Sequence, residues 1–133
     1  MANTTFSGPV RSENGFESIT KSATGAITTN ASYGKTITGG VQALSGAGAV
    51  DIINLVTEIT STGTNALTLA DGTTVGQMKI ITMVVDGGDA TLTPTTFANG
   101  STLTFGDVND TVCLVWANTI GWVIVSNSGA VVA

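Results

Sequence analysis

Histidine is absent from this chain of 133 residues, and charged residues make up only 10% of it. Without histidine the chain lacks the commonest general base and metal ligand, and every triad built on an imidazole is excluded. The low charge argues against a disordered acidic chain, because disorder needs many charges and few apolar residues. It also argues against a long amphipathic helix, which would use glutamate and lysine freely.

Cysteine is nearly absent as well, since Cys113 is the only one. A disulfide framework within the chain is therefore excluded. The neighbours of Cys113 are Val112, Leu114 and Val115, and this apolar setting favours a packing role over that of a nucleophile. A hydrolase using paired carboxylates is the remaining enzymatic alternative, but a short chain with aspartates in turns offers no evident groove. The sequence predicts that the protein is not an enzyme and uses no cofactor.

Positive charge is scarce in the C-terminal part of the chain. Residues 1–48 carry three cations and two acids, whereas residues 49–133 carry one cation and seven acids. An acidic body repels phosphate backbones, so we expect no nucleic-acid partner. The first residues lack the basic and apolar regions of a signal peptide, and no stretch reaches the roughly 18 apolar residues of a membrane span. We therefore expect a protein made in the cytoplasm, with no membrane partner.

The chain is rich in threonine, valine and isoleucine and contains 17 glycines, a composition that favours strands and tight turns. From residue 49 onwards, short apolar runs each end at a turn signal, at intervals of about 8–12 residues. The runs are 49–59, for which a short helix is the alternative to a strand, 65–70, 77–85, 90–93, 101–105 and the C-terminal stretch 109–127. This spacing predicts an all-β fold, an antiparallel β-barrel or sandwich built as a meander. No repeat of 20–50 residues is visible.

Residues 1–48 differ in composition, because they are rich in small polar residues and their apolar residues are widely spaced. We expect an extended N-terminal arm with one or two brief strands, followed by a β-domain at 49–133. Such an arm cannot offset its ordering entropy alone, so it must lie on another surface. Its best charged anchor is Arg11, because guanidinium pairs bidentately with carboxylate. The candidate docking residues are Phe6, Pro9, Val10, Arg11 and Phe16.

The C-terminal stretch 109–127 resembles a hairpin that is apolar on both faces. With a four-residue loop at 118–121, Trp116 and Trp122 point to opposite faces, whereas a three- or five-residue loop would place them on one face. One face would hold Cys113, Val115, Ala117, Trp122 and Ile124, and the other would hold Val112, Leu114, Trp116, Val123 and Val125.

A single domain core covers one face of such a hairpin, so the other face needs a partner. We expect a homo-oligomer, with the tryptophans as packing anchors rather than a platform for sugars. The predicted interface and core residues are Val112, Leu114, Trp116, Trp122, Ile124 and Val125.

Four aspartates in turns, Asp86, Asp89, Asp107 and Asp110, are weak candidates for a shared calcium site. If Gly87 and Gly88 form a two-residue turn, Asp86 and Asp89 lie opposite each other, where like charges are unfavourable unless a cation sits between them. The spacing matches no known calcium loop. Solvated turn aspartates are therefore favoured, and no metal is expected.

Several stretches carry a resemblance. FSGPVRSENGF (6–16), GQMKIITMVVDGGDATLTP (76–94), the STLTF strand (101–105) and VWANTIGWVIVSNSG (115–129) resemble small structural proteins of tailed phages, marine phages in particular. The resemblance covers most of the chain, although its motifs provide no catalytic residue to carry over.

The resemblance implies a virion component of the capsid decoration (cement) or head-fibre type. Such a protein would be a homotrimer of β-barrel or sandwich domains on the capsid surface, bound to the major capsid protein and stabilising its shell. The arm would then dock on the capsid or on a sister subunit. The alternative is a receptor-binding tip or fibre protein, in which loops 86–89 or 118–121 contact a host surface glycan.

Overall fold

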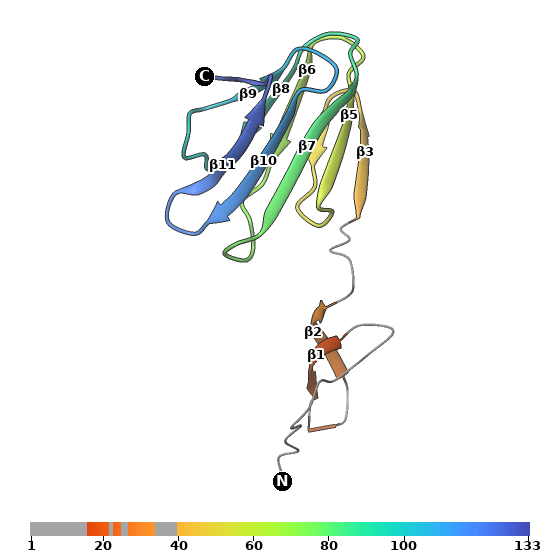
Figure 1. Ribbon diagram of the computed structural model, residues 1–133, viewed down its shortest axis with the longest axis vertical. Helices are drawn as coiled ribbons and strands as arrows, with labels where there is room; N and C mark the ends of the chain where they lie inside the picture. Colours follow the sequence, from red (N-terminus) through yellow and green to blue (C-terminus); the bar gives the residue numbers. More distant parts are fainter. Residues whose placement is uncertain (1–15, 22, 25–26, 34–39) are drawn as a thin grey trace. The chain divides into compact units, whose positions relative to one another are not determined.

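The computed structural model describes residues 16–21, 23–24, 27–33 and 40–133, and the chain divides into two units, 1–38 and 39–133. In the first unit, strands β1 (Phe16–Lys21) and β2 (Ile27–Tyr33) pair antiparallel as a two-stranded sheet. Every regular element among the described residues is a strand, which confirms the all-β prediction (Figure 1).

The second unit consists of two five-stranded sheets, neither of which closes on itself (Figure 1). The first sheet has the order β11 (Gly121–Ser128), β10 (Thr111–Ala117), β7 (Met78–Val85), β5 (Val56–Thr60) and β3 (Val41–Ser45). The second sheet has the order β12 (Val131–Val132), β9 (Leu103–Phe105), β8 (Ala90–Pro94), β6 (Asn65–Leu69) and β4 (Gly48–Val50). Residues 41–48, which we assigned to the arm, thus form β3 and begin β4 within this unit.

Both sheets are mixed, so the predicted antiparallel meander is wrong. Strands β3, β5 and β7 pair parallel in the first sheet, and β4, β6 and β8 pair parallel in the second. After β3 and again after β5 the chain crosses to the second sheet, forms one strand there and crosses back, so the next strand of the first sheet runs in the same direction. Strands β4, β6 and β8 of the second sheet are parallel for the same reason. Antiparallel pairing is confined in this unit to the strands that follow, β7–β10–β11 and β8–β9–β12.

The turns between the sheets stack on one another. The Gly46 amide donates to the Thr60 carbonyl (3.0 Å), and the Ser61 amide donates to the Val85 carbonyl (2.9 Å). The Gly87 amide donates to Ser61 Oγ (2.7 Å), and a Cβ on Gly87 would lie only 2.5 Å from the Ser61 carbonyl oxygen. The glycines of the 86–89 turn therefore serve the contact between successive turns, and this turn connects two sheets rather than two hydrogen-bonded strands.

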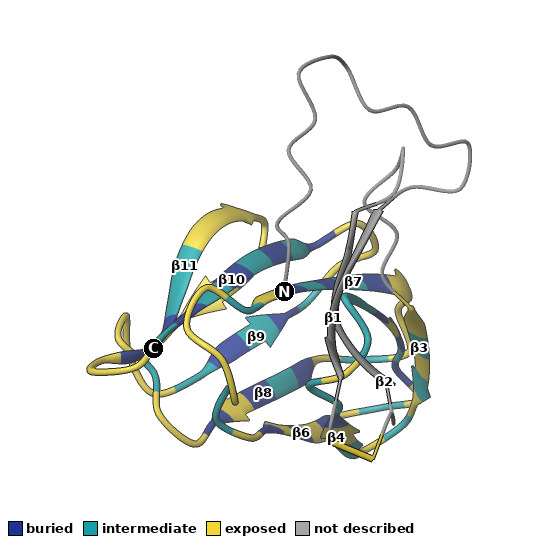
Figure 2. Ribbon diagram, turned by 90° about the horizontal axis from the view of Figure 1, so that it is seen from below, coloured by how far each residue is buried: buried dark blue, intermediate teal, exposed yellow. Residues whose placement is uncertain are grey.

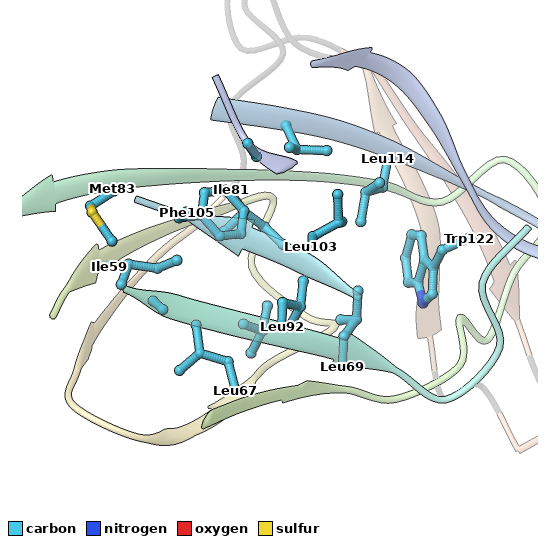
Figure 3. Packing of buried hydrophobic residues seen from close by; sticks show 14 of the residues in the cluster. Ile59, Leu67, Leu69, Ile81, Met83, Leu92, Leu103, Phe105, Leu114 and Trp122 are labelled. Atoms are coloured by element: carbon cyan, nitrogen blue, oxygen red, sulfur yellow. The ribbon is translucent and has the colours of Figure 1, made fainter. Parts of the chain in front are cut away.

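Apolar side chains from the two sheets meet in one core (Figure 3). Burial alternates along the strands, as on β6, where Asn65, Leu67 and Leu69 are buried and the two residues between them are exposed. This is the period of two that a strand imposes. The core residues are Val50, Ile59, Leu67, Leu69, Ile81, Met83, Ala90, Leu92, Leu103, Phe105, Val112, Leu114, Trp116, Trp122 and Ala130.

Candidate interaction surface

The C-terminal hairpin has a three-residue connection, because Ala117 pairs with Gly121 and Trp116 pairs with Trp122. The two indole rings meet edge to face, with centroids 5.5 Å apart. The four-residue loop, and with it the assignment of the tryptophans to opposite faces, is therefore wrong. Gly121 allows the tighter connection, since its φ of 90° lies in the left-handed region and a Cβ there would lie 2.5 Å from the Thr96 carbonyl oxygen.

The predicted interface and core residues of this hairpin divide between the core and the surface. Val112, Leu114, Trp116 and Trp122 belong to the core, and Ile124 packs against it. Val125 is 59% exposed, beside a register shift opposite Cys113 and Leu114. The Trp122 Nε1–H donates to the Ala70 carbonyl (2.9 Å), so this ring is occupied inside the fold. Neither tryptophan offers a stacking surface for a sugar.

The outer face of the first sheet is apolar at one end. Val56, Ile80 and Cys113 lie side by side on β5, β7 and β10, and Val115 lies between its partners on β7 and β11. We call the following set the apolar outer face: Val41, Val56, Met78, Ile80, Cys113, Val115 and Val123. Val41 is 56% exposed and Met78 47%, while the other five are half-buried. The free thiol of Cys113 thus lies on the surface of the sheet and not in the core.

The outer face of the second sheet is different, because threonine and alanine occupy it except at Val131. The residues on it are Ala49, Ala66, Thr68, Thr91, Thr93, Thr104 and Val131. The Thr91 and Thr104 hydroxyls lie 3.2 Å apart and hydrogen bond across the strands. Figure 2 shows β10 without exposed positions, whereas β6 alternates between buried and exposed. The outer face of the second sheet is therefore suited to contact with solvent, whereas the outer face of the first sheet presents an apolar surface to the solvent.

Charge also distinguishes the apolar outer face from the rest of the second unit. Lys79, the one cation of residues 40–133, is fully buried, so the exposed ionised side chains of this part of the chain are all acidic. Glu58 lies in the next row of the first sheet, between Ala43 and Thr82, and borders the apolar outer face without entering it. Two copies of this unit repel each other least where they meet through this uncharged surface.

The four candidate aspartates do not form a common site. Asp86 Oδ1 accepts from the Gly88 amide (2.8 Å), and Asp110 Oδ2 accepts from the amides of Gly106 (2.8 Å) and Asp107 (3.1 Å). In the part of the chain that the structure describes, no three acidic or cysteine side chains gather where a metal ion would bind. Asp86 and Asp110 bind the amides of their own turns, which is a structural role.

A polar cluster around the buried Lys79 was not foreseen from the sequence. Lys79 Nζ donates to the Asn54 carbonyl (2.7 Å) and lies 3.7 Å from Asp51 Oδ1. Asp51 in turn accepts from the Asn54 side-chain amide (2.7 Å) through Oδ2 and from the Ile53 and Asn54 amides through Oδ1. Burial lowers the pKa of the Lys79 amine, against the opposing effect of the Asp51 charge. One signal was available, since the alternation of 77–85 places Lys79 on the same face as Ile81 and Met83.

Neither a protein-family model nor a curated protein matches the chain. Among the described residues, no helix is long and apolar enough to span a membrane. The arm residues Phe6, Pro9, Val10 and Arg11 lie outside the described residues, and only the backbone of Phe16 is described, at the start of β1. The apolar outer face is therefore the feature from which function is argued.

Proposed function

We propose that the protein is a structural component of a tailed-phage virion: a homotrimeric capsid decoration (cement) protein that binds the major capsid protein and stabilises its shell. In this proposal the second unit is a β-sandwich, the arm docks on the capsid, and the protein has no enzymatic activity and no cofactor. The observation that carries the proposal is the difference between the outer faces of the two sheets. The resemblance of the sequence to small phage structural proteins supplies the virion context.

The apolar outer face supports self-association. Soluble monomers rarely expose contiguous apolar patches of several hundred Å² without a function. On the outer face of the second sheet most positions are threonine or alanine, which supports a contact role for the valines and isoleucine of the first sheet. Other copies of the chain are the partners proposed for this surface, since like-charged copies are repelled elsewhere.

The proposed stabilisation of the shell comes from several weak contacts made at once. Each copy within a trimer would bring its own arm, with Arg11 available for a carboxylate on the capsid protein. Linked binding sites act at a high effective concentration, so an assembly holds much more tightly than one arm does. A protein that works in this way needs contact area and no reaction chemistry.

The self-association is tested with a matched pair of lysine substitutions. Val115→Lys places a charge within the apolar outer face, between Met78 and Val123, and Thr93→Lys places the same charge on the exposed outer face of the second sheet. Analytical ultracentrifugation should find smaller species for Val115→Lys only. Cys113 provides an independent readout, because a thiol reagent should label it slowly in the assembled protein and quickly in Val115→Lys. A monomeric wild type with a reactive Cys113 would contradict the proposal.

Capsid binding is tested by mixing the purified protein with undecorated, expanded capsids and sedimenting them. Decoration predicts saturable co-sedimentation, which Arg11→Ala should weaken. Protein that stays in the supernatant would end the proposal. Gel densitometry of purified virions separates the alternative, because a decoration protein should approach the abundance of the capsid protein, whereas a glycan-binding tip would be present in few copies.

A further inference from the structure

Lys79 is an unusual residue for the interior of this protein. The chain has only four lysines and arginines, and Lys79 is fully buried on the inner face of β7. Burying an amine is costly unless it is well paired. Its nearest acid, Asp51, lies at 3.7 Å, beyond the roughly 2.7–2.9 Å of a charge-assisted hydrogen bond. A long ion pair alone is a weak account of this lysine.

The surroundings of Lys79 contain a carboxamide and a carboxylate in a specific arrangement. Asp51 faces the Lys79 amine with Oδ1 and binds the Asn54 side-chain nitrogen with Oδ2, at 2.7 Å. Lys79 Nζ also donates to the backbone carbonyl of Asn54 (2.7 Å). One carboxylate thus lies between an amine and a carboxamide, and the amine already contacts the residue that carries the carboxamide.

The strand pairing holds these residues together. Strands β5 and β7 are parallel neighbours, with Val56 opposite Ile80, and the Ile80 amide donates to the Leu55 carbonyl (2.8 Å). Leu55 and Lys79 directly precede this pair, and the Lys79 amine reaches the carbonyl of Asn54, one residue before Leu55 (2.7 Å). The Asn54 carboxamide oxygen also packs against Gly40, where a Cβ would collide with it. The amine thus contacts the main chain of Asn54, while the carboxamide of the same residue is held by Asp51 and against Gly40.

We propose that Lys79 and Asn54 become joined by an intramolecular amide bond, with Asp51 as the group that transfers the proton. After the Asn54 side chain turns toward the amine, the lone pair on Lys79 Nζ attacks Cγ and forms the new C–N bond. The Cγ–Nδ2 bond breaks, and its nitrogen leaves as ammonia. Asp51 takes the proton released by Nζ and returns one to Nδ2. The step balances without an oxidant, a reductant or any second reactant.

Two further features favour this reaction. Only a neutral amine is nucleophilic, and burial shifts Lys79 toward its neutral form by lowering its pKa. The two reacting residues belong to one folded chain, and an intramolecular reaction between held groups gains a large effective concentration. The product would tie the start of β5 to β7, two neighbouring strands of the sheet that carries the apolar outer face.

Intact mass spectrometry of the purified full-length chain tests the inference. After allowance for N-terminal processing, the wild type should weigh less than its sequence by one ammonia, and digestion should yield a branched peptide joining Asn54 to Lys79. Lys79→Met and Asn54→Ala should restore the sequence mass. Asp51→Asn retains both reacting residues and should also restore it, whereas Glu58→Gln, on the exposed face of β5, should still show the loss.

Two outcomes would overturn the inference. One is a wild-type mass equal to that of the sequence, with Asn54 and Lys79 recovered in separate peptides. The other is a loss of ammonia that persists in Lys79→Met, because an asparagine followed by glycine, such as Asn99, can lose ammonia by closing on its own backbone. Circular dichroism of each variant verifies folding, and Asp51→Asn remains informative if Lys79→Met does not fold. The result is independent of capsid binding.

Discussion

Truncation of Trp122 to alanine tests the packing of the C-terminal hairpin. Trp122 is fully buried, contacts Trp116 edge to face at 5.5 Å and donates its indole N–H to the Ala70 carbonyl. Removing a large buried aromatic side chain costs about 3–5 kcal/mol, of which about 0.5–1.5 kcal/mol belongs to the ring pair. A domain of this size is typically stable by about 5–15 kcal/mol, so Trp122→Ala should remove a large part of the free energy of unfolding.

A second substitution separates the packing of the ring from its hydrogen bond. Trp122→Phe retains most of the aromatic area but leaves the Ala70 carbonyl without its donor. Ala70 is an exposed residue, so water can take the place of the lost donor, and a typical hydrogen bond contributes only about 0.5–1.5 kcal/mol. This variant should therefore lie between the wild type and Trp122→Ala. Trp116→Ala should also destabilise, because Trp116 lies on the same buried face of the hairpin.

The assay is urea unfolding followed by far-ultraviolet circular dichroism, at several protein concentrations because association contributes to apparent stability. Val123→Ala is the control, since it truncates the neighbouring residue on the outer face. It should change the concentration dependence more than the stability of the subunit. The reasoning is refuted if Trp122→Ala unfolds at the wild-type urea concentration and merely dissociates, because Trp122 would then face a partner.

Three further predictions concern other parts of the fold. Gly87→Ala should lower the free energy of unfolding by about 1–3 kcal/mol, because a Cβ there would press on the Ser61 carbonyl, while Gly106→Ala, with no atom closer than 3.7 Å, should change it little in the same urea titration. Asp110→Ala should cost about 2–4 kcal/mol by calorimetry, because two amides of its turn lose their acceptor, and a change below about 1 kcal/mol would contradict this structural role. Lys79→Met should cost about 3–4 kcal/mol, the value for losing a cross-link that closes a loop of this length. Removing one partner of a buried ion pair costs a similar amount, so such a loss does not by itself establish the bond, whereas an unchanged or raised melting temperature would argue against it.

The strands were predictable from the sequence, but their partners were not. The runs 65–70, 77–85 and 90–93 correspond closely to β6, β7 and β8, because alternation and turn residues are local signals. Partner choice depends on the crossing of the chain between two sheets, and no local pattern records it. Val41, Val56 and Ile80 lie side by side in the first sheet, yet they are 15 and 24 residues apart, so no fixed repeat is visible.

The error in the hairpin faces has a simple physical source. Side chains alternate with a period of two, so a change of one residue in the loop exchanges the two faces of the following strand. The sequence predicted correctly that the hairpin is apolar on both sides, since Cys113, Val115 and Val123 lie opposite the buried set. It did not reveal that Val56 and Ile80 extend this outer surface across β5 and β7, because that requires the parallel pairing.

The difference between the two sheets is already present in their strand sequences. A sheet covered on both faces has continuous apolar strands, whereas a sheet with one face in water alternates. In the second sheet, β6 and β8 alternate leucine with threonine, as in Leu67, Thr68 and Leu69. In the first sheet, β10 carries Val112, Cys113, Leu114, Val115 and Trp116 without interruption. Strand β10 therefore has the sequence of a strand in an internal layer, although the second unit covers only one of its faces.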